Sequence, residues 1–187
     1  TAKNGKERTM ADALNAAVEW ILNRLHSNPE GILEYKSVLP RGIENQVWKD
    51  SPDAYHHSDG TLANHNAGIA SIEVQTTAYD ALLDAANLYE EHLGRAEYAN
   101  KLRDEAEKLR NTILNEFWTD DKGGYFVLGT DRDELGNLRQ LKVRTSNMGH
   151  TLNSRLLEGD DPYITDRRQS IVRQILSPEL LCASGVR

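Results

Sequence analysis

Apolar residues recur at three- and four-residue steps in long segments of this chain, and this spacing constrains the fold more than any other feature. In the first segment these positions are Leu14, Val18, Ile21, Leu22 and Leu25. This is the period of an amphipathic helix, whose apolar side chains share one face. Thr9 is suited to cap its N-terminus, and the turn-forming residues 28–31 end it. The sequence therefore predicts a helix between residues 9 and 27.

Two longer helices are predicted over residues 69–93 and 96–117, separated by Gly94. The apolar stripe of the first is formed by Ile69, Ile72, Thr76, Tyr79, Leu83 and Ala86, and its narrow polar face by Glu73, Thr77, Asp80, Asp84 and Asn87. On the second, Glu97 precedes Lys101 by four residues, which is the favoured acid-before-base spacing of a solvated helix face.

The period changes after residue 117. Residues 123–128 and 138–143 are expected to form two short strands around a turn rich in Asp, Gly and Asn, and two further helices are expected at 147–157 and 164–176. Helices in antiparallel pairs with long loops between them are typical of a bundle, an α-solenoid or an α/α toroid. We expect the loops 28–68 and 118–146 to lie at a common end of the helices.

Composition narrows the classes of protein. The chain has 187 residues, 39% of them hydrophobic, and a net charge of −7, which disfavours a nucleic-acid phosphate backbone as a partner. It contains no run of about eighteen apolar residues, so we expect no membrane partner and a cytoplasmic location. The single cysteine, Cys182, excludes an internal disulfide and a cysteine-rich zinc site.

Residues 44–53 combine an aromatic ring, amides, a cation and carboxylates within a few positions. A sugar pocket needs these groups, because sugar C–H faces stack on aromatic rings, hydroxyls pair with amides and carboxylates, and glycosidic oxygen needs a proton donor. The alternative is a surface turn, since residues 50–53 have good turn chemistry and Trp48 could anchor a core. Spacing alone leaves both interpretations open.

Four segments in order resemble the motifs of one enzyme family. Residues 45–51 read Asn-Gln-Val-Trp-Lys-Asp-Ser and resemble the NQxWKDS signature of bacterial glycogen-debranching-like proteins related to amylo-α-1,6-glucosidases. Residues 33–35 resemble the family's first loop, residues 73–75 its EVQ helix, and residues 145–150 its TSNxGH helix start. Val47 departs from the Gly or Cys that members often carry between the Gln and the Trp.

The resemblance implies an all-α fold, part of an (α/α)6 toroid of the six-hairpin glycosidase type with a small β-hairpin insertion. It also implies cleavage of an α-glucosidic linkage by two carboxylates with inversion, which requires carboxyl groups about 6.5–9.5 Å apart. Asp50 matches the general acid. Enclosure beside Trp48 would help Asp50 to keep its proton and the nearby Lys49 would oppose this, and the sequence leaves open which effect is larger. The substrate-binding residues implied are Gln46, Trp48, Lys49, Glu73, Gln75, Asn147 and His150. The partner is an oligosaccharide or glucoside, and no cofactor is expected.

The length of the chain departs from the family. A ring of six hairpins needs more helices than 187 residues hold, and the family's general base lies well downstream of the acid. We therefore expect residues 1–187 to form roughly the first half of one catalytic domain, whose remainder would be a partner of this chain. A non-catalytic α-helical scaffold and a carbohydrate-binding module that does not cleave its sugar stay open as alternatives.

Three histidines of the long loop, His56, His57 and His65, could suggest a metal site. They lack the i, i+4 helical spacing of zincins, and an adjacent pair does not converge easily on one ion. The sequence favours solvated loop histidines, and we predict no metal.

Overall fold

A computed structural model describes residues 7–39 and 41–186. The first helix, α1 (Met10–Ser27), begins at the predicted cap: the Asp12 amide donates to Thr9 Oγ1 over 3.1 Å, and the Thr9 amide donates to Asp12 Oδ2 over 2.9 Å. This reciprocal pair satisfies two of the backbone amides that every helix start leaves unpaired. The predicted N-terminus of this helix is therefore confirmed.

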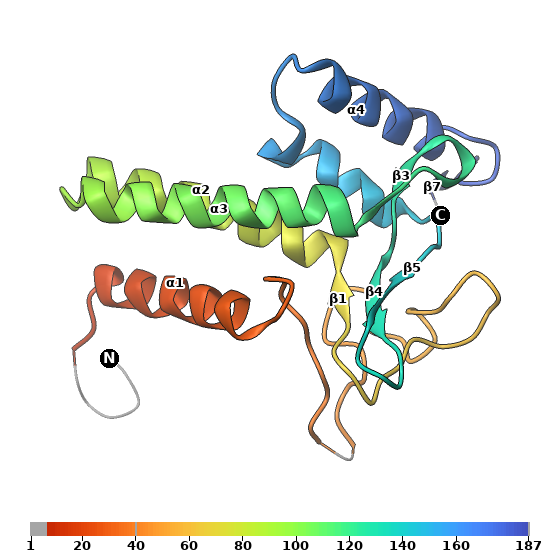
Figure 1. Ribbon diagram of the computed structural model, residues 1–187, viewed down its shortest axis with the longest axis horizontal. Coiled ribbons are helices and arrows are strands. Elements are labelled where there is room, and N and C mark those ends of the chain that lie inside the picture. Colours follow the sequence, from red (N-terminus) through yellow and green to blue (C-terminus); the bar gives the residue numbers. More distant parts are fainter. Residues whose placement is uncertain (1–6, 40, 187) are drawn as a thin grey trace.

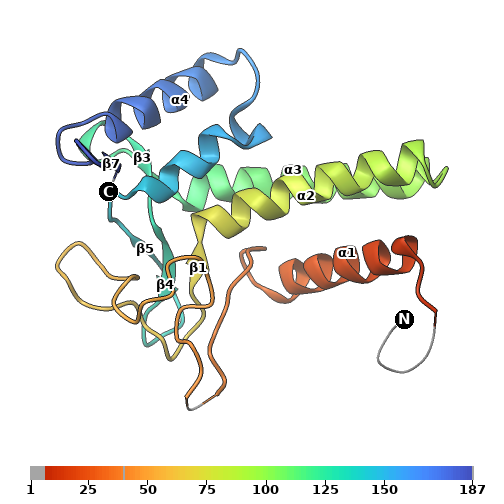
Figure 2. The same ribbon diagram turned by 180° about the vertical axis from the view of Figure 1, so that it is seen from behind.

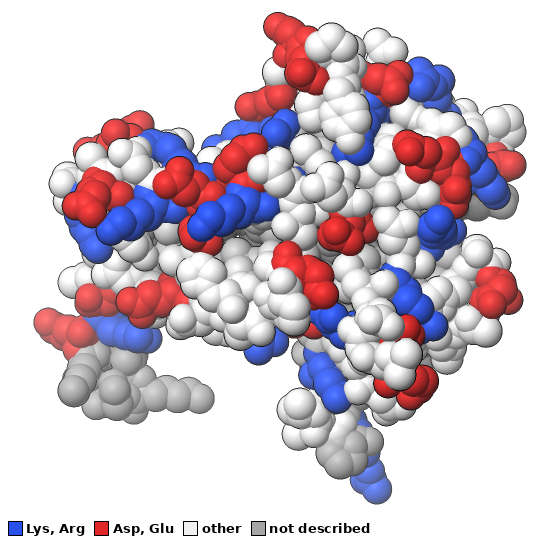
Figure 3. Space-filling view, in the orientation of Figure 1, with Lys and Arg blue, Asp and Glu red and all other residues white. Residues whose placement is uncertain are grey.

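Helices α2 (Ile72–Glu91) and α3 (Ala96–Glu116) form an antiparallel pair, which is the centre of the molecule (Figure 1). Gly94 joins them at φ 62°, a left-handed conformation that other residues adopt only with strain. Fully buried side chains along their contact include Leu82, Ala86, Tyr89, Leu102, Ala106 and Ile113. Basic and acidic side chains alternate along the outer face of α3 (Figure 3), where Lys101 Nζ lies 2.9 Å from Glu97 Oε1 as predicted.

A three-stranded antiparallel sheet lies at one end of this pair, in the order β1 (Ala70–Ser71), β4 (Gly129–Arg132) and β5 (Leu138–Leu141). Gly129 pairs with Ser71, and a Cβ atom at Gly129 would lie 2.3 Å from the carbonyl oxygen of Ala70. Only glycine permits so close an approach of β1. Because β1 leads directly into α2, this pairing fixes the position of the first turn of α2.

The remaining elements are short. They are β2 (Trp118–Thr119) paired with β3 (Tyr125–Phe126), β6 (Leu181–Cys182) paired with β7 (Gly185–Val186), 3-10 helices at Asp121–Gly123, Ser146–Leu152 and Arg155–Leu157, and helix α4 (Pro162–Ile175). In two opposite views α1 and α4 lie on opposite sides of the α2–α3 pair (Figures 1 and 2). Among the described residues, no helix combines the length and apolar character that crossing a bilayer requires.

The predicted all-α fold, part of an (α/α)6 toroid with a small β-hairpin insertion, is wrong. Of the residues that the structure describes, 48% are helical and 12% are in strands or bridges, and they form three small antiparallel sheets within a mixed α/β domain. The strands are not an insertion into a series of helical hairpins. Instead, β1 pairs with β4 of the β4–β5 hairpin, and the three strands form a layer at the end of α2. Among the described helices, only α2 and α3 pack along their length as a hairpin.

The helix predicted at 147–157 is also corrected, because two 3-10 helices replace it. Gly149 lies in the middle of the first, and glycine is a poor residue for an α-helix interior. Ser154 then caps a new start, since its hydroxyl accepts from the Leu156 amide over 3.1 Å. The helix predicted at 164–176 is confirmed as α4, which begins two residues earlier at Pro162.

The two loop regions lie at a common end of the helices, as predicted, and Asp131 joins them. Its carboxylate is fully buried and accepts hydrogen bonds from Arg139 Nε over 3.1 Å and from the Asn64 amide over 2.8 Å. His57 Nε2 lies 3.1 Å from the same carboxylate. Residues 57 and 64 of the first loop are thus held on the β4–β5 hairpin of the second.

We expect Asp131→Asn to lower the free energy of unfolding by about 1–3 kcal/mol, because the fully buried carboxylate loses its charge and with it part of its hydrogen bonds from Arg139 and the Asn64 amide. Urea unfolding measures this change. Asp104→Asn is the control: Asp104 is exposed on α3, and its substitution should stay within about 0.5 kcal/mol of the parent protein. Equal stability of the two variants would contradict the assigned role of Asp131.

Candidate functional site

Residues 45–51, here called the Trp48 loop, alternate between buried and exposed side chains although they form no strand. Asn45 is fully buried and Val47 is half-buried, whereas Gln46, Trp48 and Asp50 are exposed. Val47 packs against the small core around Tyr55. The loop therefore attaches to the protein through Asn45 and Val47 and presents Gln46, Trp48 and Asp50 outward.

Asn45 closes this loop. Its Nδ2 donates to the Ser51 carbonyl over 2.6 Å, so the two ends of the loop are joined directly. Its Oδ1 accepts from the Tyr35 hydroxyl over 2.8 Å, and His65 Nε2 lies 3.1 Å from the same oxygen. A fully buried amide with each of its polar atoms engaged is a stable anchor.

Glu73 lies in the first turn of α2, where β1 places it, and its side chain is only 10% exposed. Asn147 Nδ2 donates to Glu73 Oε2 over 2.8 Å, and His150 Nε2 lies 3.6 Å from the same oxygen. Glu73 Oε1 is buried without a hydrogen-bond partner among the described residues. The sequence had placed Glu73 on a polar helix face, whereas the structure buries it.

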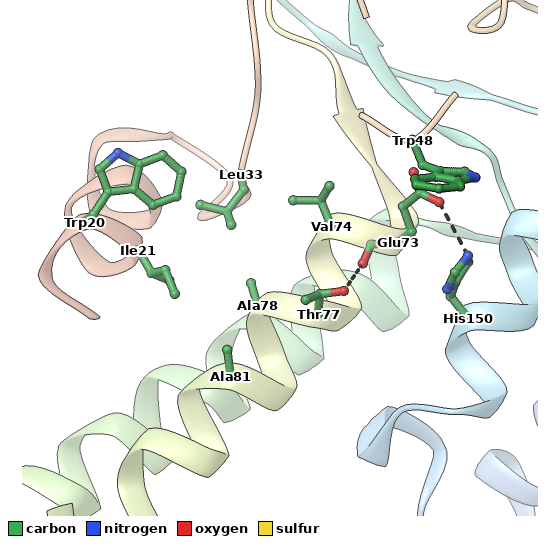
Figure 4. Close-up of a pocket in the computed structure, with 10 residues that line it drawn as sticks. All are labelled: Trp20, Ile21, Leu33, Trp48, Glu73, Val74, Thr77, Ala78, Ala81 and His150. Carbon is green, nitrogen blue, oxygen red and sulfur yellow. Dashed lines mark hydrogen bonds and ion pairs between the residues drawn. The ribbon is translucent and has the colours of Figure 1, made fainter. Parts of the chain in front are cut away.

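Glu73 lies at one end of a cavity of about 440 Å³, the Glu73 cavity (Figure 4). Trp48 and His150 approach Glu73 at this end, and Figure 4 shows them arriving from the Trp48 loop and the 3-10 helix Ser146–Leu152. The rest of the wall is mainly apolar and comes from α1, α2 and the segment after α1; its residues are Trp20, Ile21, Leu33, Val74, Thr77, Ala78 and Ala81. The cavity thus has a polar end and an apolar end.

A second cavity, of about 520 Å³, lies on the Trp48 loop itself and is called the Asp50 cavity. Its lining residues are Ile43, Asn45, Gln46, Val47, Trp48 and Asp50. Trp48 lines both cavities, so the two adjoin at this residue.

Trp48 does not enclose Asp50. Trp48 is 90% exposed and Asp50 is exposed beside it, so neither shields the other from water. Lys49 is half-buried and lines neither cavity. Of the predicted site residues, Trp48, Glu73, Asn147 and His150 meet at the Glu73 cavity, whereas Gln46 and Asp50 face the Asp50 cavity.

Gln75 is directed away from both cavities. It is fully buried, its Oε1 accepts from the Leu33 amide over 2.8 Å, and its Nε2 donates to the Leu33 carbonyl over 2.9 Å. This pair of bonds mimics a strand ladder and holds residue 33 against α2. Gln75 therefore supports the wall of the Glu73 cavity through Leu33, and its predicted contact with substrate stays a prediction.

Two tyrosines lie behind Glu73. Burial, and to a smaller extent the neighbouring Tyr55 and Glu73, raise the pKa of the Tyr35 hydroxyl well above its usual value. Burial also raises the pKa of Tyr55, against an opposing contribution from Ser71. Both hydroxyls are therefore neutral near pH 7 and can donate hydrogen bonds.

The loop histidines are not the solvated side chains that the sequence favoured. His56, His57 and His65 are all partly buried, and each has a hydrogen-bond partner, respectively the His57 carbonyl, Asp131 and Asn45. Within residues 7–39 and 41–186, no three His, Cys, Asp or Glu side chains gather closely enough to hold a metal ion.

Sequence reasoning missed Trp20 and the anchoring pair Tyr35 and His65. Trp20 lies outside the apolar stripe predicted for the first helix, and its side chain is 59% exposed at the edge of the Glu73 cavity. A large aromatic residue off the apolar face was the available signal. No sequence pattern marked the contacts of Asn45, since Tyr35 and His65 reach it across 10 and 20 residues.

Comparison with known proteins adds no assignment. No protein-family model matches the chain, and no curated protein matches it either.

We expect Gln75→Ala to lower the free energy of unfolding by about 2 kcal/mol, because it leaves both backbone groups of Leu33 without their buried partner. Gln46→Ala is a matched control, since the same change at an exposed glutamine should leave stability within about 0.5 kcal/mol. Thermal and urea unfolding measure both. A Gln75→Ala protein as stable as Gln46→Ala would show that the contact with Leu33 contributes little.

Proposed function

We propose that this chain carries the acid side of a glycoside hydrolase site of the glycogen-debranching type, which cleaves an α-glucosidic linkage by a two-carboxylate inverting mechanism. One observation supports the proposal most. The four segments that carry the resemblance, 33–35, 45–51, 73–75 and 145–150, all contribute to one location in space. The fold does not carry the proposal, because the predicted toroid is absent.

The meeting of these segments is specific. Leu33, Trp48, Glu73 and His150 come one from each segment, and all four line the Glu73 cavity. Further contacts connect the segments in pairs: Gln75 bonds the backbone of Leu33, and Asn147 bonds the carboxylate of Glu73. Segments up to about a hundred residues apart would not be expected to converge in this way if the motif matches were accidental.

The polar end of the cavity has the groups that a sugar ring requires. The exposed face of Trp48 offers a stacking surface for C–H groups. The carboxylate of Glu73 lines the cavity, and its Oε1, which is covered in this structure and has no partner among the described residues, would accept a sugar hydroxyl that displaces its cover. Asn147 and His150 hold Oε2, so they orient the carboxylate for this contact.

In the proposed reaction Asp50 transfers its proton to the glycosidic oxygen as the bond from that oxygen to the anomeric carbon breaks. A water molecule attacks the anomeric carbon from the opposite face, and a second carboxylate takes the proton that this water loses. Asp50 is two residues from Trp48 on the same loop, so a sugar that stacks on Trp48 lies near the general acid.

A carbohydrate-binding module is the second candidate, and the openness of Asp50 favours it. Asp50 is exposed to water, whereas a general acid is typically held in an apolar pocket. Stacking on Trp48 and a bond to Glu73 would suffice for binding without cleavage. The α-helical scaffold has less support, because among the described elements only α2 and α3 form a closely packed hairpin.

Asp50→Asn in the full-length protein should abolish most hydrolysis of an ordinary α-glucoside such as isomaltose and leave its binding nearly intact. The amide is close to isosteric, but the transferable proton is lost, and general acid catalysis contributes about 10²–10⁴-fold. On α-glucosyl fluoride, whose leaving group departs without a full proton transfer, the variant should recover much of its rate. Steady-state kinetics on the two substrates measure the difference.

Asp53→Asn is the control for Asp50, because Asp53 is exposed three residues later and lines neither cavity. It should retain activity on both substrates. An equal loss on both substrates in Asp50→Asn would indicate a role in binding or loop structure. Isomaltose binding without any hydrolysis by the parent protein would favour the carbohydrate-binding module.

Glu73→Gln should weaken isomaltose binding about 10- to 100-fold, since hydrogen bonds to a charged acceptor contribute about 1.5–3 kcal/mol. Isothermal titration measures the affinity. Glu91→Gln provides the same change at an exposed position on α2, away from the cavity, and should bind like the parent protein. Unchanged affinity in Glu73→Gln would remove Glu73 from the sugar site.

A further inference from the structure

The orientation of Asp50 depends on the backbone of the Trp48 loop. Asp50 makes no hydrogen bond or ion pair through its side chain with any residue in the described part of the chain, and its side chain is exposed. Trp48 is likewise exposed. A group with no partner of its own is positioned by the residues that hold its backbone.

Asn45 is the main such residue. Its bond of 2.6 Å to the Ser51 carbonyl attaches directly beside Asp50, because Ser51 is the next residue. The Ser51 carbonyl also accepts from the Ala54 amide over 3.0 Å, so this peptide group has two donors that fix its direction. Asn45 is fully buried, which protects these bonds from competition by water.

The side-chain oxygen of Asn45 connects the loop, through Tyr35, to the segment that leads into Glu73. Tyr35 donates to Asn45 Oδ1, and the backbone of Tyr35 pairs with Ile69 through bonds of 2.9 and 3.0 Å. Ile69 precedes β1, and β1 leads into the turn of α2 that bears Glu73. His65 provides a second contact to the same oxygen at 3.1 Å. A short path of hydrogen bonds and of backbone through β1 therefore connects the position of Asp50 to that of Glu73.

We propose that Asn45, held by Tyr35 and His65, is the positioning residue that sets Asp50 relative to the Glu73 end of the site. The inference rests on the proposed function, in which Asp50 is the general acid. A general acid must lie within hydrogen-bond reach of the leaving oxygen, and a misplacement of about 1 Å can lower the rate on the order of 10²-fold. Asn45 touches neither the substrate nor the reacting atoms in this role.

The test uses two variants, so that a folding defect in one does not decide it. Asn45→Asp keeps the size and the acceptor oxygens but loses the donor to Ser51. Tyr35→Phe keeps the ring and loses only the hydroxyl that fixes Asn45. Asn66→Asp is the matched control, because Asn66 is exposed in the same long loop and its side chain makes no hydrogen bond among the described residues.

Both variants are expected to show the pattern of a misplaced acid. Their kcat on isomaltose should fall about 10- to 100-fold, and their kcat on α-glucosyl fluoride by less than about threefold, with isomaltose affinity unchanged. Added to Asp50→Asn, either substitution should cause almost no further loss on isomaltose, since the group that it positions is already absent. Asn66→Asp should match the parent protein on both substrates.

A merely structural role predicts different results. It would lower both rates equally, or add its full loss to that of Asp50→Asn, and either outcome would overturn the inference. Failure of the proposed function is recognised separately, because Asp50→Asn alone would then lose both activities equally. If Asp50→Asn shows the selective loss and both Asn45→Asp and Tyr35→Phe do not, Asp50 remains the acid and Asn45 is no positioning residue.

Discussion

The arrangement of the loops on the sheet depends most on the hydrogen bonds that the buried carboxylate of Asp131 accepts. Long irregular segments do not fold by local propensity, so residues 28–68 need fixed points on a rigid element. Asp131 supplies such points through Asn64 and His57, and the neighbouring Arg132 bonds the carboxylate of Glu34 over 2.8 Å. The β4–β5 hairpin is thus the frame against which the loop is shaped.

The helices could be predicted from the sequence because their information is local. The apolar period of α1, α2 and α3, the Thr9 cap and the break at Gly94 all lie within a few residues of the structure they specify. The pairing of β1 with β4 could not be predicted in this way. It joins a two-residue strand to a four-residue strand about sixty positions later in the sequence. The pairing requires that residue 129 has no Cβ atom, and this requirement is seen only in the three-dimensional structure. The toroid prediction failed at this point, since the resemblance supplied an arrangement that local patterns could not test.

The candidate site could likewise be predicted only in part. Motif spacing predicted residues that do come together, and Glu73, Asn147 and His150 are within contact of one another although 74 or more residues separate Glu73 from the other two. It did not predict how each one is used. Gln75 and Asn45 look like surface polar residues in the sequence, yet both are fully buried and bond backbone carbonyls. A buried amide is specified by its partners, and these are distant along the chain.

The exposure of Trp48 follows from the alternation of the Trp48 loop, in which some side chains anchor the loop and others face outward. A tryptophan buries about 150–250 Å² of surface when it packs, so leaving it 90% exposed forgoes a large hydrophobic contribution. Trp118, by comparison, packs edge-to-face on Phe126 with ring centres 5.1 Å apart. Asn45 and Val47 are turned inward on either side of Gln46, so the alternation along the loop turns Trp48 outward, away from the small core around Tyr55. The anchoring of Asn45 thus keeps an aromatic face available between the two cavities, and a ligand that stacks there recovers burial that folding leaves unused.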